Sequence, residues 1–207
     1  MGTSMTGKGT LHIAVSYRDS GVEITRTYAV REEVSRDLDR YIQRPDGKDL
    51  QAWLEKKGCR LDSLGGPASV RLGADGVRED CYYRDGKKHR DGGPATLRRY
   101  ADGGRVEKYY RDGKRHRAGG PAVVVRYADG ATCDEYYWDG QKHREDGPAY
   151  VWRDANGTSV ERYYQDGKQH REDGPALVKR FADGSTYEEY YRDGKFVKEE
   201  RRATVAS

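Results

Sequence analysis

The chain has 207 residues, of which 34% are hydrophobic, and Leu, Ile, Val and Phe together account for only 29, about 14%. So low an aliphatic content is typical of disordered chains. Disorder by composition also requires a high net charge, however, and here 39 basic residues nearly balance 35 acidic ones, for a net charge of +4. The composition excludes a thick aliphatic core and favours a thin fold built from 17 tyrosines and 26 glycines.

Targeting and membrane signals are absent from the sequence. No run of about 18 apolar residues predicts a transmembrane helix, and no basic segment followed by an apolar one predicts a secretory signal. Cys59, Cys81 and Cys133 are too few and too scattered for a disulfide framework or a zinc site. We therefore expect a cytoplasmic protein. Residues 1–4 precede a second methionine and are interpreted as a vector scar outside the fold.

Residues 5–60 are predicted to form a small N-terminal ββαα cap. The alternating segments 11–17 and 22–28 predict a hairpin around Ser20-Gly21. Two helices are expected to follow, the first on Val34, Leu38, Tyr41 and Ile42 and the second on Leu50, Trp53 and Leu54, ending at Gly58. Because so small a unit has a marginal core by itself, we expect it to pack onto the rest of the chain.

Residues 61–197 repeat with a strict period of 27, which predicts an array of five stacked units. Gly-Pro-Ala begins at Gly66, Gly93, Gly120, Gly147 and Gly174, and Tyr-Tyr begins at Tyr82, Tyr109, Tyr136, Tyr163 and Tyr190. Asp-Gly turns separate short alternating runs, and such dipeptides are strong hairpin signals. The fold class is therefore predicted to be mainly β, an elongated antiparallel β-meander of five 27-residue repeats with the α+β cap at its N-terminal end.

Positions that keep the same chemical class in every repeat indicate what the architecture requires. The third residue after each Pro is apolar: Val70, Leu97, Val124, Val151 and Val178. The fourth residue after each second-turn Gly is acidic: Asp80, Glu107, Asp134, Glu161 and Glu188. The first Tyr of each pair follows two residues later, on the same strand face. Neighbouring acids repel, so we expect arginines of the repeat to neutralise them. Gly147 and Pro148 are expected to be structural, Gly147 through its backbone geometry and Pro148 at a strand start or bend.

Residues 109–120 (YYRDGKRHRAGG) resemble the MORN repeat, and residues 143–149 and 170–176 (HREDGPA) resemble its divergent bacterial and viral branch. Arg stands where the family has Gly after His, and the unit is longer than usual. The resemblance, which covers residues 64–195, implies a curved sheet of successive hairpins. It also implies a scaffolding or lipid-binding role, and some bacterial relatives are antitoxin-like. Residues 198–207 are predicted to be a charged edge strand or tail.

Histidines recur once per repeat, at His89, His116, His143 and His170. Equivalent histidines are separated by at least two strands, about 9.6 Å, whereas ligands of one zinc ion lie within about 4 Å of each other. We therefore expect structural histidines that hydrogen-bond neighbouring turns, no metal or cofactor, and no enzymatic activity, since a catalytic site is usually unique.

The candidate partner-binding residues are the second tyrosines and one arginine column: Tyr83, Tyr110, Tyr137, Tyr164, Tyr191, Arg99, Arg126, Arg153 and Arg180. Tyr and Arg are enriched at protein interfaces. The predicted function is a protein-binding module, with toxin neutralisation or immunity, or inhibition of a host protein, as specific roles. Nucleic-acid or anionic-lipid binding and a phage-encoded anti-defence role stay as alternatives, and the oligomeric state, including a homo-oligomer, stays open.

Overall fold

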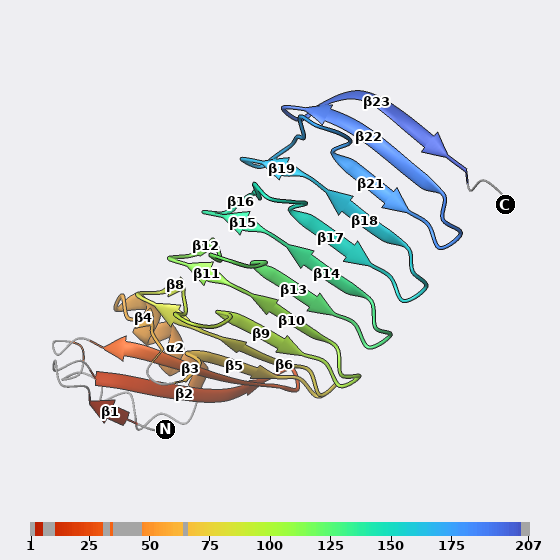
Figure 1. Ribbon diagram of the computed structural model, residues 1–207. Coiled ribbons are helices and arrows are strands. Elements are labelled where there is room, and N and C mark those ends of the chain that lie inside the picture. The colour runs from red at the N-terminus through yellow and green to blue at the C-terminus, as the bar shows by residue number, and fades with distance from the viewer. Residues whose placement is uncertain (1–2, 6–10, 31–33, 35–46, 64–65, 204–207) are drawn as a thin grey trace. The chain divides into compact units, whose positions relative to one another are not determined.

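The computed structural model describes residues 3–5, 11–30, 34, 47–63 and 66–203 (Figure 1). The chain is mainly β, with antiparallel strands in meander order, short hairpins beside them, and helix α2 (Gly47–Lys56), which confirms the predicted fold class. It divides into two compact units, residues 1–101 and 102–207, which are described separately below as unit 1 and unit 2. No helix in the described part of the chain is long and apolar enough to cross a bilayer.

Unit 1 combines the N-terminal segment with the first repeats. Its strands are β1 (Thr3–Met5), β2 (Leu11–Asp19), β3 (Val22–Val30), β4 (Arg60–Leu61), β5 (Ser69–Leu72), β6 (Arg78–Cys81), β7 (Tyr83–Arg84), β8 (Lys87–Lys88) and β9 (Thr96–Arg99). The sheet order is β1-β2-β3-β5-β6-β9, with β4 on β3, and β7–β8 form a separate hairpin. The N-terminal hairpin thus packs onto the repeats through β3–β5 pairing, as expected. Residues 3 and 4, which the sequence analysis left out of the fold, pair with β2.

The aliphatic core of the described chain lies in unit 1. Helix α2 packs on one side of β2 and β3, and Leu50, Trp53 and Leu54 bury their side chains against Ile13 and Tyr28. The Tyr28 hydroxyl donates to the carboxylate of Glu55 at 2.9 Å, which satisfies the polar end of a buried ring. The predicted helix on Leu50, Trp53 and Leu54 is therefore confirmed. Residues 35–46, which carry most of the other predicted helix, lie outside the described residues.

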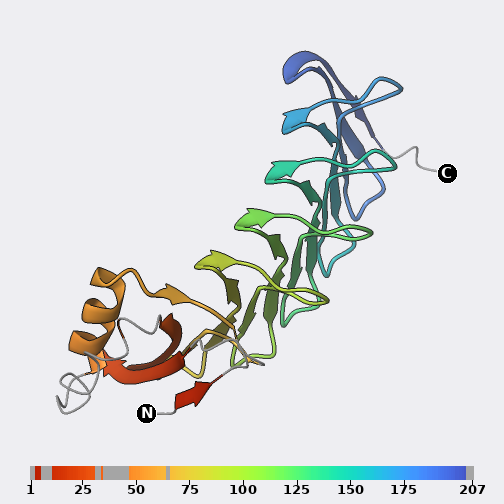
Figure 2. The same cartoon turned by 90° about the vertical axis from the view of Figure 1, so that its left-hand side faces the viewer.

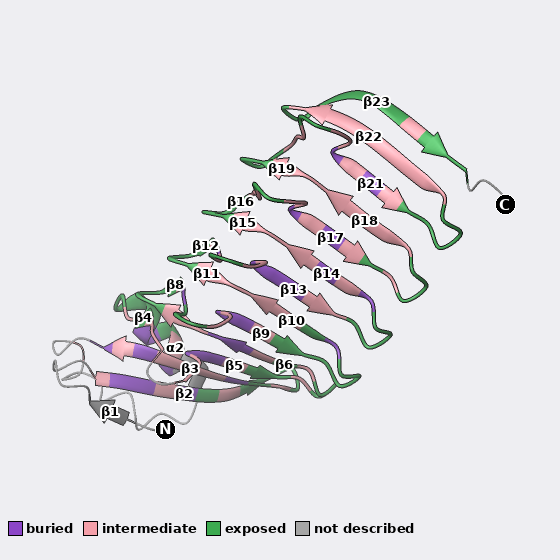
Figure 3. Cartoon of the chain, viewed as in Figure 1, coloured by how far each residue is buried: buried purple, intermediate pink, exposed green. Residues whose placement is uncertain are grey.

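Unit 2 contains the remaining repeats. The strands of its sheet, in order, are β10 (Arg105–Lys108), β13 (Val123–Arg126), β14 (Thr132–Glu135), β17 (Tyr150–Arg153), β18 (Ser159–Arg162), β21 (Leu177–Arg180), β22 (Thr186–Arg192) and β23 (Lys195–Arg202). The charged C-terminal segment forms the last of these strands, and its residues are largely exposed (Figure 3). Lys198 and Arg202 of β23 pair with Glu200 between them, at 2.6 and 3.1 Å.

All repeats of unit 2 except the last also form a short side hairpin (Figure 2). The hairpins are β11 (Tyr110–Arg111) with β12 (Lys114–Arg115), β15 (Tyr137–Trp138) with β16 (Gln141–Lys142), and β19 (Tyr164–Gln165) with β20 (Lys168–Gln169). The chain leaves the main sheet between the two tyrosines of each pair. The Tyr136 N–H donates to the Ala149 carbonyl at 2.7 Å, and the Tyr136 carbonyl accepts the His143 N–H at 3.2 Å. In β22, by contrast, the strand continues through a bulge between Tyr190 and Tyr191.

The two turns of each repeat differ in backbone conformation. At the hairpin tips both central residues have positive φ, as at Asp139 (46°) and Gly140 (93°), which is the type I′ pattern expected for Asp-Gly. At the second turn only the glycine does, as at Gly130 (91°). There the Asp129 carboxylate accepts the Ala131 N–H at 2.9 Å and stabilises a longer turn. Of the two Asp-Gly turns, only the hairpin tip therefore has the type I′ conformation.

Candidate interaction surface

Successive residues of a strand point to opposite sides of the sheet, so the register divides the repeat strands into two faces. In unit 2, Val124 of β13 lies between Glu107 of β10 and Asp134 of β14. We call this side, with its apolar, acidic and arginine columns, the repeating face, and the opposite side the variable face. The variable face of unit 2 carries Val106, Val125, Cys133, Trp152, Val160, Lys179, Tyr187 and Arg201 in one row, and Lys108, Val123, Glu135, Tyr150, Arg162, Leu177, Glu189 and Glu199 in another.

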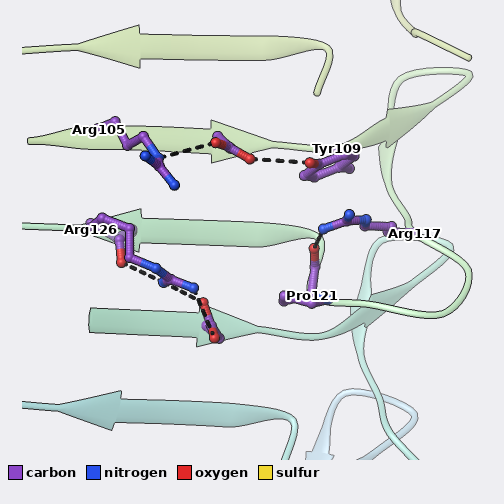
Figure 4. Close-up of polar contacts among 8 residues, drawn as sticks. Arg105, Tyr109, Arg117, Pro121 and Arg126 are labelled. Atoms are coloured by element: carbon purple, nitrogen blue, oxygen red, sulfur yellow. Dashed lines mark hydrogen bonds and ion pairs between the residues drawn. The ribbon is translucent and has the colours of Figure 1, made fainter. Parts of the chain in front are cut away.

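The predicted arginine column lies on the repeating face, where it pairs with the acidic column. Arg126 donates to both carboxylate oxygens of Asp134, at 2.6 and 3.3 Å (Figure 4), and Arg180 donates to Glu161 at 3.0 Å. In unit 1, Arg99 donates to the buried carboxylate of Asp80 at 3.0 Å. Arg153 forms no ion pair in the described part of the chain. The expected neutralisation is confirmed at three of the four arginines, which are therefore occupied within the fold.

The first tyrosines share the repeating face, because the Tyr109 hydroxyl donates to Glu107 at 3.1 Å (Figure 4). Four of the five stack against a second arginine, the one that follows the repeat histidine, whereas Tyr190 faces Lys198. The Arg117 guanidinium lies 3.8 Å from the centre of the Tyr109 ring and donates to the Pro121 carbonyl at 3.2 Å. Arg90, Arg144 and Arg171 stack in the same way at 3.8–4.0 Å. In these four repeats, the arginine thus holds the loop between the histidine and the proline with one cation–π contact and one hydrogen bond.

The same arginine explains the invariant glycine. A Cβ atom added at Gly147 would lie 3.1 Å from Cζ of Arg144, and the other repeat glycines from Gly93 onward face their arginines as closely. Gly147 is not among the positive-φ glycines, so the expected backbone reason is wrong at this position. Glycine is needed there because the guanidinium lies against the main chain. Pro148 supplies the carbonyl that this guanidinium reaches, at 3.4 Å.

The histidines join successive repeats, as predicted. Nδ1 of His116, His143 and His170 accepts the backbone N–H of Asp139, Asp166 and Asp193, at 3.3, 3.2 and 3.0 Å. These aspartates are the positive-φ residues of the next hairpin tip, so each histidine fixes the adjacent turn. In unit 1, Nε2 of His89 lies 3.0 Å from a carboxylate oxygen of Asp91 and, with Arg84, lowers the pKa of Asp91.

The second tyrosines lie on the other side of the sheet from the arginine column. Tyr83, Tyr110, Tyr137 and Tyr164 each begin a side hairpin, and Tyr191 follows the bulge in β22, 5.7 Å from the Phe196 ring. The Tyr137 hydroxyl donates to Glu135 at 2.7 Å and accepts from Arg115 at 3.0 Å. Burial, reinforced by Glu135, raises the pKa of Tyr137 to about 12.

The structure therefore does not bring the predicted tyrosine and arginine candidates together into one surface. The physical reason is strand alternation: Arg126 shares its side with Val124 and Asp134, whereas Tyr137 shares its side with Glu135. The tyrosines are half-buried rather than freely exposed, and Tyr137 is also hydrogen-bonded.

The sequence reasoning missed the residues of the variable face, because it looked only for positions that recur. Equivalent positions in successive repeats hold Arg98, Val125, Trp152 and Lys179 there, whereas the apolar and acidic columns of the repeating face each keep one chemical class. In unit 1 this face of β2 and β3 is covered by α2. Within unit 2 the side hairpins reach one row of this face, as in the 3.3 Å ion pair of Lys142 with Glu135, and Val123 and Cys133 are buried. Tyr127 and Phe181 at its border are 50% and 36% exposed. The signal that could have identified the face was its variation from repeat to repeat.

Chemistry-bearing side chains do not gather into a metal site: no group of three or more His, Cys, Asp or Glu among the described residues is placed to hold an ion. Burial raises the pKa of the Cys81 and Cys133 thiols, which favours the protonated form. Comparison with protein-family models finds no match, and comparison with curated proteins finds none either. The resemblance to the MORN repeat therefore stays a prediction.

Proposed function

We propose that the chain is a non-enzymatic protein-binding module that holds its partner on the variable face of unit 2. The proposal is supported by a difference between the two faces in how their side chains are paired. The repeating face uses its side chains on one another, in pairs such as Arg126–Asp134 and Arg144–Tyr136. On the variable face, Val125, Trp152 and Val160 are half-exposed. Apolar and aromatic groups that change from repeat to repeat suit recognition of a particular surface.

The specific role proposed for this binding is neutralisation of a toxin or inhibition of a host protein. It rests on the resemblance of the HREDGPA units to the antitoxin-like MORN branch. In either role, the chain would act by covering a surface of its partner, and a single-layer sheet offers a broad surface for that purpose.

Nucleic-acid or anionic-lipid binding is the second candidate, and one feature favours it. Lys108, Arg162 and Lys179 share the variable face with the rings of Tyr150 and Trp152, and the Arg162 guanidinium lies 5.3 Å from the Tyr150 ring centre. Cations beside aromatic rings are typical of single-strand binding sites. Glu135, Glu189 and Glu199 on the same face oppose the binding of phosphates, so we rank this candidate second.

Affinity capture from a lysate of the source organism tests the proposal. The bait is the full chain, beside Trp152→Ser on the variable face and Arg153→Ser, its neighbour on the repeating face. We expect a stoichiometric protein that survives nuclease treatment, is lost with Trp152→Ser and is retained with Arg153→Ser. Recovery of nucleic acid alone, with affinity falling steeply as salt rises, would contradict the proposal and favour the second candidate.

A further inference from the structure

An open groove of about 680 Å³ lies at the C-terminal end of unit 2. Its walls come from β18, β21, β22 and β23, whose variable-face residues form two rows. One row is Val160, Lys179, Tyr187 and Arg201, and the other is Arg162, Leu177, Glu189 and Glu199. Phe181, just beyond β21, also lines it. We call this site the terminal groove.

The terminal groove has an apolar floor. Val160 and Leu177 lie in the adjacent strands β18 and β21 and are half-buried, and Phe181 is 36% exposed. Burial of apolar surface is the main favourable term in association, so this floor suits a bulky apolar side chain. Repeats elsewhere in unit 2 have Tyr127 or Asp154 at the position of Phe181, and Trp152 or Val125 at that of Lys179. Within unit 2, the combination of Lys179 with Phe181 is therefore specific to this end of the array.

The cations of the terminal groove are not all used within the fold. Arg162 and Lys179 form no ion pair among the described residues, and Nε of Arg162 is buried without a hydrogen-bond partner there. The Lys179 ammonium instead lies 4.4 Å from the Phe181 ring centre.

The acids of the groove, in contrast, are engaged. The Tyr187 hydroxyl contacts Glu189 at 2.6 Å and Glu199 at 2.7 Å, and Arg201 lies 3.6 Å from Glu199. The groove side chains without an ion pair among the described residues are therefore Arg162, Lys179 and Glu189, whose charges sum to a net positive charge.

We propose that the terminal groove binds an acidic, extended segment of a partner protein, in which two carboxylates are followed by a bulky apolar side chain. The inference rests on the proposed protein-binding function and names the chemistry of the partner. Arg162 and Lys179 are diagonal neighbours on adjacent strands, a separation of about 7–8 Å. In an extended chain, residues i and i+2 are separated by about 6.6 Å and point to the same side, so two such carboxylates match the two cations.

Residue i+4 of the same segment reaches the apolar floor. Phe181 lies two residues beyond Lys179, on the same face of the chain. An apolar side chain two residues beyond the second carboxylate therefore reaches it, and the pattern of the bound segment is acid, any residue, acid, any residue, apolar. Two cations fit this segment better than a nucleic acid, whose affinity comes from many phosphate contacts and stacked bases.

The test is an NMR titration of the ¹⁵N-labelled full chain with the blocked pentapeptide Glu-Ser-Glu-Ser-Leu. We expect saturable shifts of backbone amides in residues 160–181 and submillimolar affinity. The peptide Gln-Ser-Gln-Ser-Leu should bind at least five-fold more weakly, since it lacks both carboxylates. Lys179→Gln should weaken binding of the acidic peptide at least five-fold, whereas Arg180→Gln, one residue away on the repeating face, should change it less than two-fold.

Absence of saturable binding at 5 mM peptide, or equal losses for Lys179→Gln and Arg180→Gln, would overturn the inference. So would tighter binding, at the same amides, of a six-nucleotide oligothymidylate. Failure of the peptide leaves the proposed function intact if a captured protein still depends on Trp152. If instead nucleic acid alone is captured, the proposed function fails with it. The two failures are therefore distinguishable.

Discussion

Val124 and Val125 are neighbours in β13, yet they belong to different kinds of surface. Val124 is 7% exposed and lies in a row of acids and valines that every repeat reproduces. Val125 is half-buried and lies beside Val106 and Cys133, at a position whose residue type varies among the repeats. The difference between the two faces explains how a sheet with few aliphatic residues stays folded. The repeating face satisfies its charges and rings by pairing them, and the opposite face is left free to vary.

The largest expected effect comes from placing a carboxylate on each face in turn. Val124→Asp puts a third acid between Glu107 and Asp134 in a buried row, and we expect a loss of about 3 kcal/mol or more in the free energy of unfolding. Val125→Asp should cost about 1 kcal/mol or less, as at a partly exposed site. Urea unfolding followed by circular dichroism measures both, and equal losses would remove the distinction between the faces.

Arg144 is an arginine whose side chain the fold uses, whereas Arg153 has no ion pair with any residue that the structure describes. We expect Arg144→Ala to cost about 2 kcal/mol, from the lost Tyr136 stack and the hydrogen bond to the Pro148 carbonyl. Arg153→Ala should stay within about 0.5 kcal/mol, because the side chain is exposed. Thermal and urea unfolding check the pair. A loss for Arg153→Ala as large as that for Arg144→Ala would contradict this assignment.

Gly147 and Gly66 occupy the same position in different repeats. Gly147→Val should cost about 1–2 kcal/mol, because the added side chain displaces the Arg144 guanidinium. Gly66 has no atom within 4 Å of an added Cβ, so Gly66→Val should be nearly neutral. The double variant Gly147→Val with Arg144→Ala should lose little more than Arg144→Ala alone, as measured by urea unfolding. Additive losses would show that glycine is required there for another reason.

A smaller effect is expected at the histidines. His143→Ala removes the acceptor of the Asp166 N–H and should cost about 1 kcal/mol. Gln141→Ala, an exposed residue of the same hairpin, serves as the control and should be neutral. Because the histidines have equivalent roles, His143→Ala should remove no binding activity that His116→Ala keeps. Loss of partner capture with only one of the two would indicate a functional histidine instead.

The smallest effect concerns alkaline stability and tests the variable face. Burial raises the pKa of Tyr137 and Tyr150 to about 12, whereas an unfolded tyrosine titrates near 10. The stabilisation from these raised pKa values is fully present below pH 10 and is lost as pH rises toward 12, because the unfolded state releases its protons first. Tyr137→Phe should flatten this decline in chemical unfolding measured from pH 9 to 12. A slope unchanged by Tyr137→Phe would contradict the assignment.

Much of the fold could be predicted from the 27-residue period, the Asp-Gly turns and the alternation within each strand. The corner between Tyr136 and Tyr137 could not, because alternation continues smoothly through both residues. What bends the chain is a switch of hydrogen-bond partners, from the Ala149 carbonyl on one side of Tyr136 to the His143 N–H on the other. The invariance of Gly147 was visible, but its cause, the guanidinium of Arg144, is a contact that only the folded loop creates.

The candidate site was harder to predict for a different reason. Recurring residues attract notice in a repeat, and the arginine column was chosen on that ground. In the structure those arginines neutralise acids such as Asp134. Variation, as at Trp152 and Lys179, is the better sign of recognition in such an array, because the architecture does not constrain it.

The most direct test of the two faces is photo-crosslinking in cells of the source organism. A benzophenone amino acid replaces Trp152 or Lys179 on the variable face, and Arg153 or Arg180 on the repeating face, within the same strands β17 and β21. We expect a discrete protein adduct from positions 152 and 179 and none from 153 and 180 at equal expression. Adducts from 153 and 180 alone, or equal adducts from both faces, would contradict it.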